Sequence, residues 1–302
     1  MSLLRSLLGK FSSPEQMESI TKLHHRADTT QVEAEALTEL LFAVFVTAAF
    51  IGTYQTVVFN VLQTAFWKQY EYSQNRKAFR KVAYQITNLT VNAILGIYGL
   101  YIFHSSVPPL HTVPIHERIS GFDEYALFGA LQVGYNLWAL PIGYFFMNET
   151  QAMMAHHLAV LCVGSISSFA TNGFRYHAPF FFGVIEISSV PLAIMNFCKD
   201  QEEITKAYCP KLPLVVRPVF AVVFLMVRVV LWTPLIGDVL RLAGLLGMTC
   251  ETGVCMVGIG SFALSAVFLT LLQFYWALLI VKGIRNALKG EDRSGSQKIK
   301  RP

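Results

Sequence analysis

The sequence predicts an all-α fold, a polytopic membrane bundle of about seven transmembrane helices. Hydrophobic residues make up 54% of the 302 residues and charged residues only 14%, against about 25% in a soluble domain. Apolar runs of membrane-spanning length recur along the chain, and the loops between them are too short for a second folded domain. The net charge of +5 comes from bases in these short loops, so we expect no nucleic-acid partner.

The chain divides into three regions. Residues 1–36 are polar and mixed in charge, which predicts a luminal or interfacial segment. The apolar part of Met1–Phe11 is too short for a secretory signal peptide, so we expect the first span to direct insertion. Residues 37–282 are predicted to form the transmembrane domain, and residues 283–302 a basic cytosolic tail.

The predicted spans are apolar runs of sufficient length to cross hydrocarbon. They cover residues 39–64, 83–103, 125–147, 152–170, 178–198, 214–236 and 257–281. Lys and Arg cluster in alternate loops, whereas the loops between hold one base each, Arg118, Arg175 and Arg241. This alternation predicts a luminal N-terminus and a cytosolic C-terminus. An odd number of spans likewise requires the two termini to lie on opposite sides of the membrane.

Two short segments indicate the membrane in which the chain resides. Cys250 and Cys255 share a loop on the predicted luminal side, where disulfides persist, so a small disulfide-closed loop is expected; two free thiols are the alternative. Lys298 and Lys300 stand five and three places from the end, as in dilysine signals for retrieval to the endoplasmic reticulum. Attraction of a basic tail to anionic lipid is the other interpretation. We expect a multipass protein of the endoplasmic-reticulum membrane.

Polar residues form a belt near the middle of the predicted bundle. With a helical rise of about 1.5 Å per residue, Glu186 lies roughly 18 Å and Arg228 roughly 20 Å above the cytosolic boundary. An ionisable group in hydrocarbon costs at least about 2.5–3.5 kcal/mol, so we expect these two to pair inside the protein. Asn92, Asn136 and Gln273 fall at about 13–16 Å by the same rise. The belt indicates a polar cavity. Alternatively, the pair of Glu186 and Arg228 only fixes the register of the helices.

A tandem histidine stands near the start of the fourth predicted span. His157, roughly 8 Å above the cytosolic boundary, shares a helical stripe with Gly164, Ser165 and Ser168, and small residues favour close packing. His156 is rotated by about 100° from that stripe. We therefore expect His157 nearer the cavity, with His156 supporting it, because imidazole can act as base or nucleophile. A structural role for both is the alternative. No further ligands stand at helical spacing, so no metal site is predicted.

These residues resemble the signature of the TLC-domain family, which includes ceramide synthases and lipid-homeostasis proteins. The run 155–160, Ala-His-His-Leu-Ala-Val, is similar to the family's tandem-histidine signature. Gly134-Tyr135 resembles its Gly-Tyr element, Glu186-Ile187-Ser188 its Glu-Leu-Ser motif, and Phe224 to Arg228 its Phe…Arg stretch. The four elements occur in the family's order on the expected spans. The resemblance extends over residues 39–282.

The resemblance implies a lipid protein of the endoplasmic reticulum. By analogy with ceramide synthases, His156 and His157 would transfer an acyl chain from acyl-CoA, a co-substrate, to a membrane lipid or sphingoid-like acceptor. The resemblance implies no bound cofactor. Glu186, Arg228, Asn92, Tyr135, Asn136 and Ser165 are the predicted cavity residues, and a homodimer is a further expectation.

The segment Gly183–Ser188 departs from the ceramide-synthase pattern. In those enzymes a His-Asp and a further Asp follow the tandem histidine, and both acids are missing here. The departure favours a branch of the family other than the ceramide synthases. It also leaves open a non-catalytic protein that binds or senses lipid or acts in trafficking. A seven-span receptor is disfavoured, because Asp-Arg-Tyr after the third span and Asn-Pro-x-x-Tyr in the seventh are both missing.

Overall fold

The computed structural model describes residues 34–66, 76–170, 174–250 and 252–288, and all regular secondary structure in these ranges is helical. The longer helices are α3 (Ala34–Ala65), α5 (Arg76–Ser105), α7 (Ala126–Ile142), α8 (Gln151–Ser165), α10 (Ser189–Asp200), α12 (Leu212–Leu225), α13 (Trp232–Thr249) and α14 (Gly253–Leu288). The shorter ones are α6 (Ile115–Ser120), α9 (Ala178–Phe181) and α11 (Glu202–Tyr208). Short 3₁₀ turns are η2 (Leu110–Thr112), η3 (Asp123–Tyr125), η6 (Arg175–His177) and η7 (Val184–Ser188), and π-helical turns are η4 (Gly143–Met147), η5 (Ile166–Ala170) and η8 (Met226–Leu231).

The prediction of a polytopic α-helical membrane protein is confirmed. Six helical stretches in the described residues are long and apolar enough to cross a membrane. They are Ala36–Ala65, Lys77–Ser105, Gln151–Phe169, Arg175–Asp200, Leu212–Met248 and Gly253–Leu288. The remaining predicted span, residues 125–147, forms α7 and η4 but does not belong to this set. It contains the buried polar residues Gln132, Tyr135 and Asn136.

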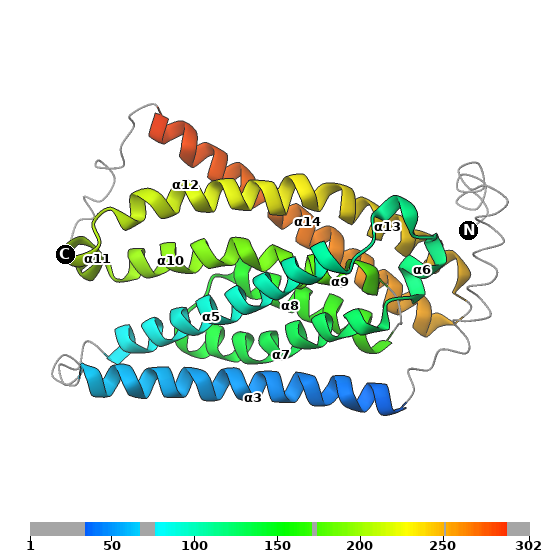
Figure 1. Cartoon of the computed structure of the whole chain (residues 1–302), viewed down its shortest axis with the longest axis horizontal. Coiled ribbons are helices and arrows are strands. Elements are labelled where there is room, and N and C mark those ends of the chain that lie inside the picture. Colours follow the sequence, from blue (N-terminus) through cyan, green and yellow to red (C-terminus); the bar gives the residue numbers. More distant parts are fainter. Residues whose placement is uncertain (1–33, 67–75, 171–173, 251, 289–302) are drawn as a thin grey trace.

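The long helices run side by side along the longest axis of the molecule (Figure 1). α3 contacts α5 and α7, and α7 contacts α8. α10 lies between α5 and α12, while α14 packs against α8 and α13. The first residues of α3 and the last residues of α14 lie at opposite ends of this axis (Figure 1).

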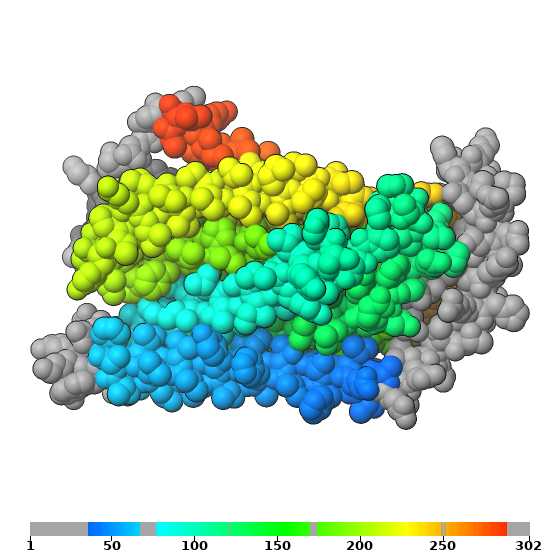
Figure 2. All heavy atoms as spheres, in the orientation of Figure 1, coloured from blue at the N-terminus to red at the C-terminus, as the bar shows by residue number. Residues whose placement is uncertain are grey.

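The outer surface of the bundle is apolar. α3, α5 and α12 lie on one face, with α3 along its edge (Figure 2). On α3, the exposed fractions of Phe42, Phe45 and Phe50 are 69%, 66% and 66%. The polar side chains of the belt are instead buried inside. This inverted distribution is suited to lipid around the bundle, because hydrocarbon solvates Phe but not amides or charges.

The sixth predicted span is longer than expected. The sequence predicts its end near residue 236, whereas α12, η8 and α13 continue the helix to Thr249. Arg241, predicted in a loop, therefore lies on α13. The reason is an apolar stripe at helical spacing, Val239, Leu242, Ala243 and Leu246, which is buried against the core.

Two other bases predicted in loops are buried by ion pairs. Arg118 donates to Asp238 of α13 at 2.5 Å, and His177 contacts the other oxygen of that carboxylate at 3.0 Å. Arg175 is bonded to Asp123. Arg118 and Arg175 are only 8% and 4% exposed. The contacts of Arg118 and His177 tie α6 and η6 to α13, and the Arg175 pair ties η6 to η3.

The fifth span is broken in its middle. α9 ends at Phe181, and regular α-helix resumes only at Ser189, after Gly183 and the 3₁₀ turn η7. α5 approaches the break so closely that a Cβ atom at Gly99 would overlap the backbone of Gly183. Glycines at both positions therefore permit the contact. The break leaves backbone carbonyl groups free for side-chain donors, which is tolerated at membrane depth only inside protein.

Candidate functional site

The tandem histidine lies in the second turn of α8. The helix begins after Thr150, whose hydroxyl accepts a hydrogen bond from the backbone N–H of Met153. The ring centroids of His156 and His157 are 5.6 Å apart, and the ring planes are inclined at 64°. Because successive helical residues are rotated by about 100°, the two rings have different surroundings.

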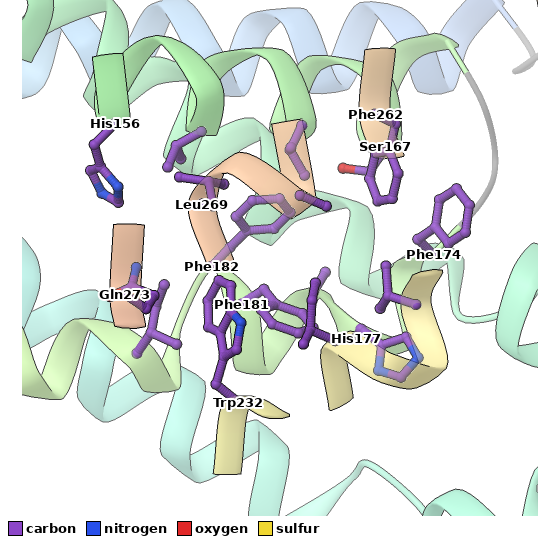
Figure 3. A pocket seen from close by; sticks show the side chains of 17 residues that line it. His156, Ser167, Phe174, His177, Phe181, Phe182, Trp232, Phe262, Leu269 and Gln273 are labelled. Atoms are coloured by element: carbon purple, nitrogen blue, oxygen red, sulfur yellow. The ribbon is translucent and has the colours of Figure 1, made fainter. Parts of the chain in front are cut away.

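His156 faces a narrow, almost wholly apolar cavity (Figure 3). Its volume is about 40 Å³. The polar residues of its lining are His156, Ser167, His177, Trp232 and Gln273. His156 and Gln273 lie toward one end and His177 toward the other (Figure 3). The ring of His156 also contacts that of Trp276 on α14, at 5.5 Å between centroids.

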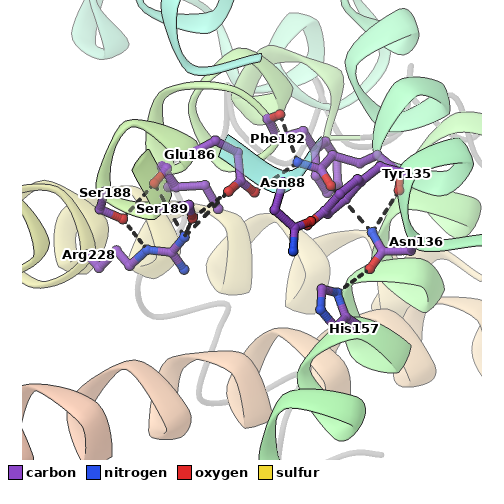
Figure 4. Close-up of polar contacts among 11 residues, drawn as sticks. Asn88, Tyr135, Asn136, His157, Phe182, Glu186, Ser188, Ser189 and Arg228 are labelled. Atoms are coloured by element: carbon purple, nitrogen blue, oxygen red, sulfur yellow. Dashed lines mark hydrogen bonds and ion pairs between the residues drawn. The ribbon is translucent and has the colours of Figure 1, made fainter. Parts of the chain in front are cut away.

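His157 is held by a buried amide on α7 (Figure 4). Its Nδ1 lies 2.8 Å from Oδ1 of Asn136, whose Nδ2 donates to the backbone carbonyl of Gln132 at 2.7 Å. A carbonyl oxygen can only accept, so Nδ2 of Asn136 faces Gln132 and its oxygen faces the imidazole. Nδ1 of His157 must therefore carry the proton and donate it. The other ring nitrogen, Nε2, retains its lone pair in this tautomer.

The same hydrogen-bond chain continues to the intramembrane acid. Nε2 of Gln132 donates to Oε1 of Glu186 at 2.9 Å, and the hydroxyl of Ser189 donates to Oε2 at 2.7 Å. Arg228 lies 3.7 Å from Oε2 of Glu186, so the structure brings the predicted pair together. The imidazole, two amides, the carboxylate and the guanidinium thus form one network across α7, α8, the broken span and η8 (Figure 4).

The helix break supplies further acceptors to this network. Gln132 also donates to the backbone carbonyl of Phe182 at 3.2 Å. Arg228 donates through Nε to Ser188 at 2.6 Å and through an η nitrogen to the carbonyl of Ile185 at 3.3 Å. A continuous helix would have used these carbonyls internally. Arg228 itself stands in the π-helical turn η8, a distortion that often occurs at functional sites.

A larger cavity of about 270 Å³ adjoins the network. The predicted site residues that line it are His156, His157, Glu186, Arg228, Asn92, Tyr135 and Asn136. Glu149, in the turn between α7 and α8, also contributes, so the lining reaches from mid-bundle to one end. His156 and Val160 line both cavities. The two spaces therefore meet at the first histidine.

The other predicted residues have different positions. The hydroxyl of Tyr135 donates to Asn88 at 2.9 Å, whereas Ser165 lies outside the lining of both cavities. Cys250 and Cys255 are joined by a disulfide. Lys298 and Lys300 lie outside the described residues. In the described part of the chain, no three His, Cys, Asp or Glu side chains are grouped as metal ligands would be.

Gln132, which links the histidine half of the network to the acid half, is not among the residues predicted from the sequence. A signal was available, because Gln132 stands one turn before Asn136 on the same face of an apolar run. Asn88, Ser188 and Ser189 were also missed as hydrogen-bonding residues. Ser and Asn are common enough in membrane helices that their identity alone does not mark a site.

Comparison with protein-family models matches residues 81–282 to the TLC domain. The chain belongs to the TLC-domain family. The TLC match begins in α5 and ends in α14, so it contains every residue of the network and of both cavities. Searches of curated proteins and of solved structures gave no significant match. The candidate site therefore lies within the TLC domain.

Proposed function

We propose that this TLC-domain protein transfers an acyl chain from acyl-CoA to a lipid acceptor, with the tandem histidine as the reactive centre. The single observation that carries the proposal is the geometry at His157. Its Nδ1–H is held by Asn136, which leaves Nε2 as an unprotonated nitrogen at a cavity wall. A buried, oriented imidazole of this kind is suited to general-base or nucleophilic catalysis.

In the proposed reaction, Nε2 of His157 takes the proton from the amine or hydroxyl of the acceptor. The acceptor attacks the thioester carbon, a new amide or ester bond forms and the carbon–sulfur bond breaks. The proton then passes from the imidazolium to the thiolate, so the products are the acylated lipid and free CoA. Acyl-CoA enters from the end of the cavity at Glu149, which we assign to the cytosolic side. His156 contacts the acyl group.

The ion pair supports the site in this proposal without reacting. Glu186 anchors Gln132, and Gln132 fixes the orientation of Asn136, which selects the tautomer of His157. Arg228 balances the charge of Glu186 at 3.7 Å. Gln132 itself lines the larger cavity, and its removal should lower activity because the orientation of His157 is lost.

Lipidomics with labelled acyl-CoA tests the proposal. Membranes with the wild-type protein should contain a labelled lipid that disappears when His157 is replaced by Ala. General acid–base residues contribute about 10²–10⁴-fold to rate, so a loss of at least about 100-fold is expected. His111→Ala, an exposed histidine outside both cavities, is the matched control and should leave the product unchanged.

Equal abundance of the variants in the membrane is required for the comparison. An unchanged lipid profile in His157→Ala and in the double variant with His156→Ala would refute acyl transfer. A product that vanishes equally in His111→Ala would point to a general effect of the substitutions.

A non-catalytic lipid-binding or lipid-sensing protein is the second candidate. It is favoured by the segment Gly183–Ser188, which lacks the acids expected of a ceramide synthase and whose Glu186 is already paired. In that case acyl lipid would co-purify with the wild-type protein and with His157→Ala in equal amounts, without any labelled product.

We also infer residence in the endoplasmic-reticulum membrane, with a luminal N-terminus. The disulfide between Cys250 and Cys255 supports an oxidising compartment on that side of the α13–α14 connection. The dilysine-like tail and the predicted homodimer are part of the same proposal. Glycosylation of acceptor sites inserted after Gly253 or before Lys211 would distinguish the two orientations.

A further inference from the structure

Gln273 is a buried amide without a hydrogen-bond partner. It lies in the middle of α14, is 1% exposed, and neither its Oε1 nor its Nε2 is paired with any described residue. A buried amide without partners is costly, and a membrane interior supplies no bulk water to relieve it. Gln132 and Asn136 in the same belt are hydrogen-bonded, and Asn92 has one unpaired buried atom, Oδ1, whereas Gln273 has two. Gln273 therefore calls for a partner from outside the chain.

A second unpaired polar atom lies at the same end of the narrow cavity. Nδ1 of His156 is buried and has no partner among the described residues, and both His156 and Gln273 line that cavity. Trp276, one helical turn after Gln273, contacts the ring of His156, so this face of α14 is turned toward α8. Figure 3 shows the two side chains at the same end of the cavity.

The rest of the cavity favours a hydrocarbon. Beyond His156 and Gln273 the lining is mainly aromatic and aliphatic, with Phe181, Phe182 and Leu269 among its members. A volume of about 40 Å³ has room for only the first few atoms of an unbranched chain. The unpaired donor and acceptor thus lie at one end, whereas His177 and Trp232 elsewhere in the lining are already bonded to Asp238 and Thr270, and most of the other lining residues are apolar. An acyl group has the same division, with a carbonyl at the head of a chain of methylenes.

We propose that Gln273 binds the carbonyl oxygen of the acyl group through its Nε2–H, next to His156, while the first part of the chain enters the apolar cavity. This inference rests on the proposed function. During transfer, negative charge develops on the carbonyl oxygen, and a fixed amide N–H directed at that oxygen stabilises it. Gln273 would then contact the reacting group directly and recognise acyl donors by their carbonyl.

A pair of ligands that differ only in the carbonyl tests this contact. Palmitoyl-CoA has a thioester, and S-hexadecyl-CoA has the same chain length and a thioether. Dissociation constants are measured for the full-length protein in nanodiscs, without acceptor. The wild-type protein should bind the thioester about five- to tenfold more tightly, the worth of one net hydrogen bond. Gln273→Met should reduce this ratio to about one by weakening thioester binding alone.

The melting temperature of Gln273→Met shows whether the substitution has damaged the fold. Met has nearly the length of Gln and no polar atoms to leave unpaired, so Gln273→Met should melt at the wild-type temperature or above it. Gln55→Met is the matched control, because Gln55 accepts a bond from Trp138 and lies outside both cavities. It should retain the wild-type preference for the thioester.

The outcomes distinguish this inference from the proposed function. Equal binding of both ligands by the wild-type protein, or a preference that survives in Gln273→Met, overturns the inference and leaves acyl binding intact. Failure of the wild-type protein to bind either ligand overturns both. If Gln273→Met does not fold, a second measurement tests the hydrogen bond: the infrared stretching frequency of the ¹³C-labelled carbonyl group of palmitoyl-CoA bound to the wild-type protein. A lower frequency than in apolar solvent supports the hydrogen bond, and an unshifted one overturns it.

Discussion

The ion pair between Glu186 and Arg228 illustrates how single residues set the site. The side chains are 11% and 6% exposed, so neither charge is solvated by the surroundings. Each depends on neighbours: Ser189 and Gln132 bond the carboxylate, and Ser188 bonds the guanidinium. Removal of one charge leaves the other buried without compensation, whereas removal of both need not destabilise the fold.

Arg228→Met should destabilise the protein by about 3–5 kcal/mol, because the Glu186 carboxylate then lies unpaired. The double variant with Glu186→Gln should recover most of this loss. Denaturant or thermal unfolding of the purified protein in detergent measures both. Additive losses from the two single substitutions would show that the charges do not interact.

At the scale of elements, the broken fifth span determines the shape of the site. At the break, the carbonyl groups of Phe182 and Ile185 accept hydrogen bonds from Gln132 and Arg228. α5 packs tightly on the break, where Gly99 meets Gly183. The position of Glu186 therefore depends on the distance between two helices as well as on its own span.

Gly99→Ala should lower stability by about 1–3 kcal/mol, as expected for overpacking, and should weaken acyl-CoA binding. The added methyl group would overlap the Gly183 backbone, which cannot rotate away. Gly244→Ala is the matched control, because a Cβ atom there meets nothing within 4 Å. Unfolding midpoints of the two variants provide the comparison, and equal midpoints would contradict the role of the close contact.

At the scale of the whole molecule, a polar cluster joins the helix ends around Glu149, which lines the larger cavity. Asp200 at the end of α10 accepts a bond from Gln85 of α5 at 2.6 Å and lies 3.9 Å from Lys81. Glu149, in the turn between α7 and α8, lies in the same cluster. Burial, and then the negative charge of Asp200, raise the pKa of Glu149 above its ordinary value.

This raised pKa predicts a pH dependence of stability. Since the folded state favours the protonated carboxyl, the contribution of Glu149 to stability is fully present below its ordinary pKa of about 4.5 and is lost as pH rises through the raised value. Glu149→Gln, which mimics the neutral form, should therefore melt above wild type at pH 7.5. The difference should disappear toward pH 4. A constant difference across this range would assign the effect to packing instead.

The sequence determined the class of the protein and most of its spans. Hydropathy, length and loop charge are local properties, so the apolar runs are predictable without knowledge of their neighbours. The resemblance carried by His156, His157, Glu186 and Arg228 indicated the TLC family, which the family comparison confirmed. The continuation of α13 beyond residue 236 was not predicted, because its apolar stripe can be recognised as buried only when the core that it packs against is known.

Only the tertiary structure decided which polar atoms meet. Gln132 joins His157 to Glu186 because α7 presents one face to both α8 and the broken span. The break at Gly183, which frees the carbonyl groups, occurs where Gly99 of α5 packs directly on the backbone of Gly183. The unpaired state of Gln273 likewise depends on every neighbour of α14. Rotation of a helix about its axis and the satisfaction of its polar groups are set by packing between helices, whereas apolarity and length are set residue by residue along the chain.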